Sequence, residues 1–416
     1  MSQAGAQCTR ALRYGAPESS VMVRVGGFRF AAVSAGIKKD SKPDLGLVVA
    51  DGGAVAAGVF TRNLVRAAPV DVAAERLRVA RSVHAILVNS GCANACTGRA
   101  GLDATLLSTR AIAEALVLDE SSVLPASTGV IGVTLPHERV IASADDLVAG
   151  LGDDQAQSFA EAICTTDRWP KLADESLGDG RARLLGIAKG AGMIHPDMGL
   201  VGSPHQATLL AFLFTDALVR REVLEYALVA AVDKTFNACS VDGDTSTNDT
   251  VIALASGASG YEADAGELGH AMFAVCDKLA RSIVADGEGA DHVAEIHVRG
   301  LSTTEDARIV ARTVATSLLV KTALHGKDAN WGRLLAAAGR AGVRFDPSRA
   351  RIAIGGVDIV RDGVTLGGAA EKAVAAVLAQ SSYVIELDLG GGPGEFVYLT
   401  SDLGHGYVDV NASYRS

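Results

Sequence analysis

The stretch Gln206-Ala-Thr-Leu-Leu-Ala-Phe-Leu-Phe-Thr-Asp216 passes directly from a polar loop into an apolar run. The run Leu209–Phe214 predicts a buried β-strand, and it is far too short to span a bilayer. Thr208 stands at the mouth of this strand. A hydroxyl in such a position suits a nucleophile, whereas a threonine that starts a strand usually reflects β-propensity alone. Both interpretations stay open on these residues.

Strand-like and helix-like segments occur throughout the rest of the chain. Leu102–Leu118 and Arg221–Phe236 carry apolar residues three or four positions apart, the period of one buried helix face. Further helices are expected at Gly266–Val284 and Ala369–Leu378. The remaining expected strands are Val21–Val25, Phe28–Val33, Leu45–Ala50, Ala85–Val88, Val251–Ala255, Ala294–Val298, Arg351–Val360 and Val384–Leu389. Loops are expected at Pro170–Gly180 and Gly199–Gln206, and a hairpin turn at Gly390–Gly394. This mixture predicts an α/β or α+β, enzyme-like chain.

Composition narrows the class of protein. The chain has 416 residues, of which 49% are hydrophobic and 21% charged, as in globular proteins. At about 150 residues per domain, this length suggests two or three lobes. The net charge of −10 is a poor match for binding nucleic acid or anionic lipid through bulk charge. Met1–Ser20 has no continuous apolar core of a secretory signal, and the six scattered cysteines predict no disulfide framework. We therefore expect a cytoplasmic protein without a metal.

Small and polar residues are concentrated in a few segments with apolar surroundings. Ala126-Ser-Thr-Gly-Val130 could turn backbone N–H groups into a site as an oxyanion hole, or form an ordinary turn at a strand end. Lys189-Gly-Ala-Gly-Met193 could bind a carboxylate through its lysine, or lie on a surface loop. Asp242–Thr250 lines a polar pocket or is solvated. Glu288, between two glycines, either faces a site or ends a helix at the surface.

Ten motifs in this order carry a family resemblance. They are Gly36-Ile-Lys38, Phe60-Thr-Arg-Asn63, Asn89-Ser-Gly-Cys-Ala-Asn-Ala-Cys-Thr-Gly98, Ser127-Thr-Gly-Val-Ile-Gly132, Lys189-Gly-Ala-Gly-Met193, Ala207-Thr208, Asp242-Gly-Asp-Thr-Ser-Thr-Asn-Asp249, Asp286-Gly-Glu-Gly289, His325-Gly-Lys-Asp-Ala-Asn-Trp-Gly-Arg333 and Tyr407-Val-Asp-Val-Asn-Ala-Ser-Tyr-Arg-Ser416. Together they resemble the glutamate N-acetyltransferase (ornithine acetyltransferase) family of arginine biosynthesis. The resemblance runs from near residue 20 to the last residue.

The resemblance implies a precursor that cuts itself between Ala207 and Thr208. The products would be an alpha chain, 1–207, and a beta chain, 208–416, which stay associated, with two copies of each in a heterotetramer. It also implies a two-lobed, sandwich-like arrangement of mixed sheets and helices, with chemistry of the N-terminal-nucleophile type. The new α-amino group of Thr208 has a reference pKa of about 7.7–8.0, so it can act as the base for its own hydroxyl.

The implied reaction moves an acetyl group from N2-acetylornithine to glutamate through an acetyl ester on Thr208, in a ping-pong scheme without a cofactor. Carried over by motif, Thr128 and Gly129 form the oxyanion hole. The carried-over substrate-binding residues are Thr165, with Thr166 adjacent as the alternative, Lys189, Thr208, Glu288, Asn411 and Ser416. A lysine suits the α-carboxylate that both substrates share, and a glutamate suits an amino group.

Several alternatives to this reaction remain open. Part of the family also uses acetyl-CoA to acetylate glutamate, and related enzymes serve antibiotic pathways. An amidase with water as the acceptor would share the first half-reaction. An inactive relative that acts as a binding partner is a third interpretation, because eight residues, Gly199–Gln206, are inserted before the expected cleavage point. Ser416 also stands where threonine is common, and Cys92 where asparagine is frequent.

Overall fold

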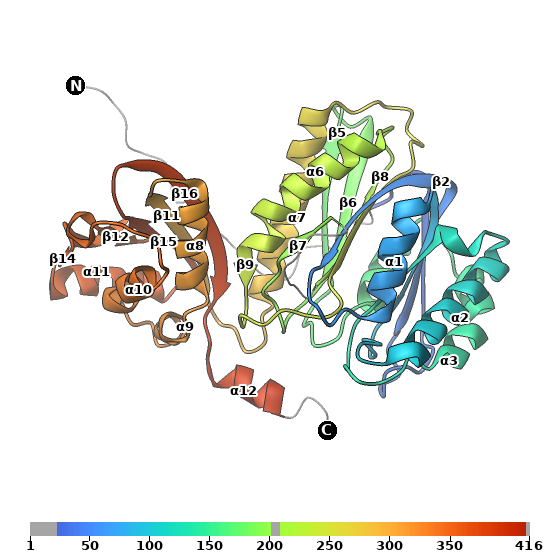
Figure 1. The fold of residues 1–416 in the computed structure, drawn as a ribbon, viewed down its shortest axis with the longest axis horizontal. Helices are drawn as coiled ribbons and strands as arrows, with labels where there is room; N and C mark the ends of the chain where they lie inside the picture. Colours follow the sequence, from blue (N-terminus) through green and yellow to red (C-terminus); the bar gives the residue numbers. More distant parts are fainter. Residues whose placement is uncertain (1–22, 201–208, 413–416) are drawn as a thin grey trace. The chain divides into compact units, whose positions relative to one another are not determined.

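The computed structural model describes residues 23–200 and 209–412. Ala207, Thr208 and Ser416 lie outside the described residues, as does the start of the expected strand Val21–Val25. The chain forms two compact units, one extending to Glu288 (the N-terminal unit) and one covering Gly289–Asn411 (the C-terminal unit). The expectation of a mixed α/β chain is confirmed, because both units combine mixed sheets with helices (Figure 1).

The N-terminal unit is built on strands in the order β4-β3-β2-β10-β8-β6-β5, with β1 and β7 also paired to β2. The strands of this sheet are β1 (Phe28–Val33), β2 (Leu45–Thr61), β3 (Val83–Asn89), β4 (Val123–Ser127), β5 (Lys171–Leu177), β6 (Ala182–Lys189), β7 (Met198–Gly199), β8 (Leu210–Thr215) and β10 (Thr250–Ala255), and the two-residue strand β9 (Cys239–Ser240) is not part of it. The central pair β8 and β10 is parallel, whereas β6 and β2 flank it in antiparallel register.

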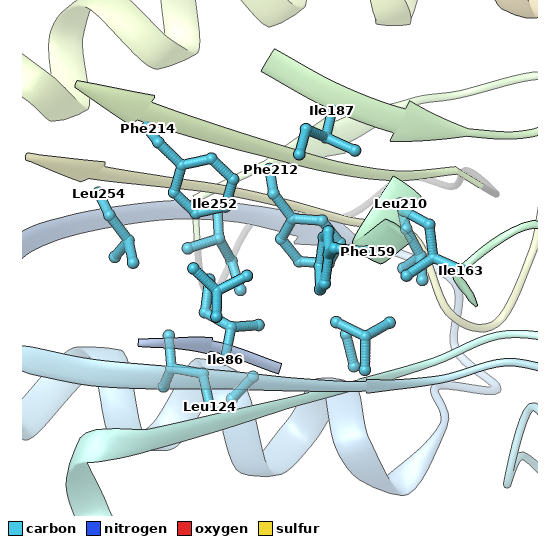
Figure 2. Close-up of a cluster of buried hydrophobic side chains, with 14 of the residues drawn as sticks. Ile86, Leu124, Phe159, Ile163, Ile187, Leu210, Phe212, Phe214, Ile252 and Leu254 are labelled. Carbon is cyan, nitrogen blue, oxygen red and sulfur yellow. The ribbon is translucent and has the colours of Figure 1, made fainter. Parts of the chain in front are cut away.

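The long strand β2 joins two layers of this sheet. Its first part pairs with β1 and β3, and its last part pairs with β10. The register to β3 shifts between Val49 and Ala54, where the chain reads Asp51-Gly-Gly53. Figure 2 shows the core between the layers, with Ile86 and Leu124 on one side and Phe212 and Ile252 on the other.

In the described residues of this unit, seven helices pack on the two layers, and two of them, α1 and α5, contribute side chains to the core between the layers. They are α1 (Ala68–Val79), α2 (Gly98–Leu116), α3 (His137–Ala142), α4 (Ala144–Ala149), α5 (Ala156–Ala162), α6 (Arg221–Lys234) and α7 (Ala265–Ala285), with short 3-10 turns at Glu120–Ser122 and Phe236–Ala238. Helix α7 packs on β5 and β6 and against α6 (Figure 1). Helix α2 packs with α3 and α4, and their apolar residues form a second core against β1, β2 and β3.

The C-terminal unit has its own sheet, in the order β14-β13-β12-β15-β11-β16. Its elements are β11 (Val293–Gly300), α8 (Thr304–Ala315), α9 (Leu318–His325), α10 (Trp331–Gly339), a 3-10 turn (Pro347–Arg349), β12 (Arg351–Ile354), β13 (Val357–Arg361), β14 (Val364–Thr365), α11 (Gly368–Leu378), β15 (Ser382–Asp388), β16 (Gly392–Ser401) and α12 (His405–Ala412). Strand β11 lies between β15 and β16, parallel to the first and antiparallel to the second. The expected hairpin turn at Gly390–Gly394 is therefore wrong: the segment crosses over β11.

Three other expectations need correction. The expected strand Arg351–Val360 is a hairpin of β12 and β13, because Gly355 and Gly356 both adopt positive φ, at 56° and 79°. The expected loop Pro170–Gly180 contains β5, whose polar residues pair with β6. No strand is found over the described residues 23–25. Within residues 23–200 and 209–412, no helix combines the length and apolar character that crossing a membrane requires.

Candidate functional site

Lys189 is the centre of the site and the last residue of β6. Its ammonium donates hydrogen bonds to the hydroxyls of Thr128, at 3.2 Å, and Thr165, at 2.8 Å. All three residues were expected to be functional, and the fold brings them together from β6, from the end of β4 and from the loop after α5. Lys189 is 5% exposed, so it is a buried charge and the surface-loop interpretation of its motif is wrong.

The turn after β4 provides donors of two kinds. The N–H of Thr128 donates to the Asn89 carbonyl, so only the side-chain hydroxyl of Thr128 is available to a ligand. The N–H of Gly129 makes no hydrogen bond to any described residue. Gly129 has a φ of +132°, and a Cβ there would overlap the backbone of Gly91 and Cys92, so only glycine fits. An unpaired N–H beside a hydroxyl is a suitable arrangement for stabilising an oxyanion.

A cavity of about 800 Å³ opens beside this turn. Gly129 and Thr165 line it, together with Thr166 and apolar residues such as Ile37 and Val133. Of the two adjacent threonines, Thr165 is the one whose hydroxyl Lys189 reaches. This contact favours Thr165 over Thr166 as the residue that acts with the lysine.

Asp167 lies directly behind Lys189. Its carboxylate is fully buried and accepts hydrogen bonds from the backbone N–H groups of Thr165, at 3.0 Å, and Gly190, at 2.7 Å. Lys189 Nζ is 3.9 Å from Asp167 Oδ2. Burial alone would raise the pKa of Asp167, but the ammonium groups of Lys189 and Lys171 hold it below its ordinary value.

Glu288 packs against the loop that follows Lys189. Its N–H donates to the Ala191 carbonyl at 2.9 Å, and a Cβ at Gly192 would overlap its carboxylate. Gly192 therefore allows the Glu288 carboxylate to lie against the loop that follows Lys189. A cationic and an anionic side chain that flank one loop can bind the two charged ends of an amino acid.

The polar segment Asp242–Thr250 packs against the site: Ser246–Thr250 is buried, whereas Gly243 and Asp244 are exposed to solvent. Asp242 accepts hydrogen bonds from the N–H groups of Met193, at 2.6 Å, and Ile194, at 2.9 Å. Burial raises the pKa of Asp242 to about 6. The Asn248 amide donates to the Ser127 carbonyl at 2.8 Å, so the segment ties the lysine loop to the turn at Thr128.

Asp249 is a residue that sequence reasoning did not single out. Its carboxyl group is fully buried, and neither oxygen has a hydrogen-bond partner among the described residues. Burial raises its pKa well above the ordinary value, against the attraction of Lys189. The next residue, Thr250, donates its N–H to the Leu209 carbonyl at 2.9 Å, so this acid lies beside the start of β8.

The remaining expected site residues are placed as follows. Leu210, the first residue of β8, is the register partner of Lys189 across the β6–β8 ladder. The described residues that follow Thr208 therefore lie next to Lys189. Asn411 belongs to α12, where its side-chain amide donates to the Tyr407 carbonyl at 3.0 Å. Thr208 and Ser416 lie outside the described residues.

Sequence reasoning missed Asp167 and Lys171 and gave Asp286 no role. Lys171 lies inside the segment Pro170–Gly180 that was expected to be a loop, and Asp167 lies just before it, so nothing suggested that they were buried. The spacing of four residues between Asp167 and Lys171 is no signal for their contact, because it brings side chains together only on a helix and residues 164–170 are not helical.

Comparison with known proteins adds an independent finding. The sequence model of the ArgJ family matches residues 29–416. The chain belongs to the ArgJ family. The resemblance inferred from the motifs is thereby confirmed, and the match includes every candidate site residue from Thr128 to Ser416.

ArgJ relatives match along nearly their whole length. The "Arginine biosynthesis bifunctional protein ArgJ" of Nitratidesulfovibrio vulgaris is 44% identical over 94% of this chain and 98% of its own. The protein of the same name from Syntrophotalea carbinolica is 45% identical over 95% of this chain and 100% of its own.

Two solved structures are also similar. ArgJ of Bacillus halodurans is 37% identical, with a TM-score of 0.47 over 49% of this chain and 98% of that chain. Ornithine acetyltransferase of Mycobacterium tuberculosis, solved with ornithine, is 39% identical, with a TM-score of 0.41 over 42% of this chain and 94% of that chain.

Proposed function

We propose that this protein transfers an acetyl group from N2-acetylornithine to glutamate, in arginine biosynthesis, through an acetyl ester on Thr208. Membership of the ArgJ family supports this class of reaction. The observation that carries the proposal is the cluster at Lys189. There a buried ammonium, the Thr128 hydroxyl and the Gly129 N–H, which has no partner among the described residues, lie beside the strand that follows Thr208.

The nucleophile arises by self-cleavage between Ala207 and Thr208. The Thr208 hydroxyl attacks the Ala207 carbonyl carbon, the peptide C–N bond breaks, and the ester that forms is hydrolysed by water. The products are the alpha chain, 1–207, and the beta chain, 208–416, whose first residue carries a free α-amine. This amine takes the proton from the Thr208 hydroxyl in each later attack.

Strand pairing supports lasting association of the two chains. Strand β8 of the beta chain pairs with β6 of the alpha chain, and β10 pairs with β2. Phe212 and Phe214 from β8 lie in the same core as Ile86 and Leu124 from the alpha chain (Figure 2). Separating the chains would expose this core, so they stay together as one folded unit. A pair of such units makes the proposed heterotetramer.

The first half-reaction acetylates Thr208. Its oxygen attacks the acetyl carbon of N2-acetylornithine, and the resulting oxyanion receives hydrogen bonds from the Gly129 N–H and the Thr128 hydroxyl. The C–N bond then breaks, and the departing amine of ornithine takes the proton held by the Thr208 α-amine. In the second half-reaction the glutamate amine attacks the ester, which gives N-acetylglutamate and restores the Thr208 hydroxyl.

We assign substrate recognition to the charged side chains of the site. Lys189 binds the α-carboxylate that both substrates share, with Thr165 beside it. Glu288 binds the amino group of the ornithine side chain, and Asn411 and Ser416 are further substrate-binding residues of this proposal. No cofactor takes part, and acetyl-CoA is a second acetyl donor to be tested.

One experiment tests the function against its main alternative. Purified protein is incubated with N2-acetylornithine, with and without glutamate, and ornithine, acetate and N-acetylglutamate are measured. Formation of N-acetylglutamate in step with ornithine supports acetyl transfer. Release of acetate at a rate that glutamate does not change identifies an amidase instead.

A further inference from the structure

Behind Lys189 lies a row of buried charges that the proposed reaction does not use directly. The side chains of Asp167, Lys171 and Asp286 are all 0% exposed. Lys171 Nζ donates to Asp167 Oδ1 at 2.7 Å, to Asp286 Oδ2 at 2.6 Å and to the Trp169 carbonyl at 3.2 Å. These contacts use all three donors of the ammonium. Lys171 therefore has no capacity left for a ligand and acts on its neighbours.

The row connects to both charged groups of the site. Asp167 accepts a hydrogen bond from the N–H of Gly190, the residue after Lys189. Asp286 follows the end of α7 and precedes Glu288 by two residues. Its carboxylate accepts from the Arg168 N–H at 3.0 Å and from Arg168 Nε at 2.8 Å. One ammonium thus ties the base of the lysine loop to the base of the turn that carries Glu288.

The distances show which of the two nearby lysines Asp167 pairs with directly. It lies within hydrogen-bonding distance of Lys171, whereas Lys189 Nζ is 3.9 Å away and donates instead to the neutral hydroxyls of Thr128 and Thr165. A direct ion pair between Asp167 and Lys189 would occupy the Lys189 ammonium with a carboxylate of the protein itself. Buried carboxylates without a cation are costly, and Lys171 offsets the charge of both Asp167 and Asp286, together with Arg168 at Asp286. Burial opposes the charged form of Lys171, but these two carboxylates raise its pKa.

We propose that Lys171 is a positioning residue for substrate binding: by occupying Asp167 it leaves the Lys189 ammonium free to bind the α-carboxylate of both substrates. This inference rests on the proposed function, because it concerns the same lysine and the same substrates. Removing the Lys171 charge would let Asp167 draw Lys189 into a direct pair. Affinity for both substrates would then fall together, since they share the carboxylate.

The test compares three variants with the wild type, each scored first for self-cleavage by denaturing electrophoresis. In Lys171→Met we expect the KM for N2-acetylornithine and the KM for glutamate to rise together by about tenfold or more, as when a charge-assisted hydrogen bond is weakened. The kcat should change much less. Lys278→Met is the matched control, because Lys278 forms an exposed ion pair with Glu175 on the same unit. Its KM values should match those of the wild type.

The double variant Lys171→Met/Asp167→Asn distinguishes positioning from a general structural defect. It removes the carboxylate that would pair with Lys189, so both KM values should return most of the way to those of the wild type. It also leaves no unpaired charge at position 167, which guards against a single variant that fails to fold. A double variant with KM values as high as the single one, or a folded single variant with wild-type KM, overturns the inference. Failure of the wild type to cleave or to transfer acetyl groups would instead reject the proposed function.

Discussion

The ammonium of Lys189 donates a 2.8 Å hydrogen bond to the hydroxyl of Thr165, although 24 residues separate the two in the chain. The contact follows from the sheet, because β6 ends at Lys189 where the loop after α5 passes. The same ammonium reaches Thr128, which follows a strand of the other layer. The site therefore lies where the ends of strands from both layers meet.

The hydroxyl of Thr128 is predicted to contribute to the oxyanion hole, since its N–H is already used by Asn89. Thr128→Ala should lower kcat by about 10²–10³-fold, the typical cost of removing one such donor. Thr128→Ser keeps the hydroxyl and should retain most of the activity. Steady-state kinetics on cleaved protein measure both. Equal losses in the two variants would show that the hydroxyl is not the group that matters.

Gly192 is predicted to control the position of Glu288. Gly192→Ala introduces a Cβ that overlaps the Glu288 carboxylate, so this side chain must move and the KM for N2-acetylornithine should rise. Gly269→Ala, in α7, is a matched control because a Cβ there meets nothing within 4 Å. The control should behave like the wild type. A wild-type KM in Gly192→Ala would argue against a role of Glu288 in binding.

Asp249 is predicted to make stability depend on pH. Its folded-state pKa is raised by burial, so its contribution to stability is fully present below the unfolded-state pKa of about 4 and is lost as pH rises through the folded value. Asp249→Asn cannot ionise and should therefore lose less stability between pH 4 and pH 8. Urea unfolding across this range measures the difference. Parallel curves for the two proteins would mean that Asp249 has an ordinary pKa.

The two chains are predicted to separate only on unfolding. A tag on the segment 1–207 should retain 208–416 on a column in native buffer and release it in denaturant, because β6–β8 and β2–β10 pair across the cut. Thr208→Ala should remain one chain that elutes together. Loss of the second chain in native buffer would contradict the interleaved sheet.

The sequence was most informative where patterns are local. The apolar run Leu209–Phe214 predicts β8, and the helical period of Gly266–Val284 predicts α7. It was least informative where burial depends on partners distant in sequence. Strand β5 was expected to be a loop because its residues are polar, and its place at the sheet edge comes from pairing with β6. Lys171, its first residue, was missed for the same reason.

The chemistry at Thr128 and Gly129 shows a similar limit. The motif indicated an oxyanion hole, but only the structure shows that the first residue offers its hydroxyl and the second its N–H. The pairing of Asn89 with Thr128 depends on β3 and β4 lying in parallel. Residue type alone does not determine that register.

The most direct test of the central claim is mass spectrometry of the peptide that begins at Thr208. The protein is exposed briefly to N2-acetylornithine without glutamate, then denatured and digested. We predict one added acetyl group on this peptide, lost again when glutamate is supplied before denaturation. An intact Ala207–Thr208 bond in fully active protein, or turnover with no acetyl group ever found on this peptide, would contradict it.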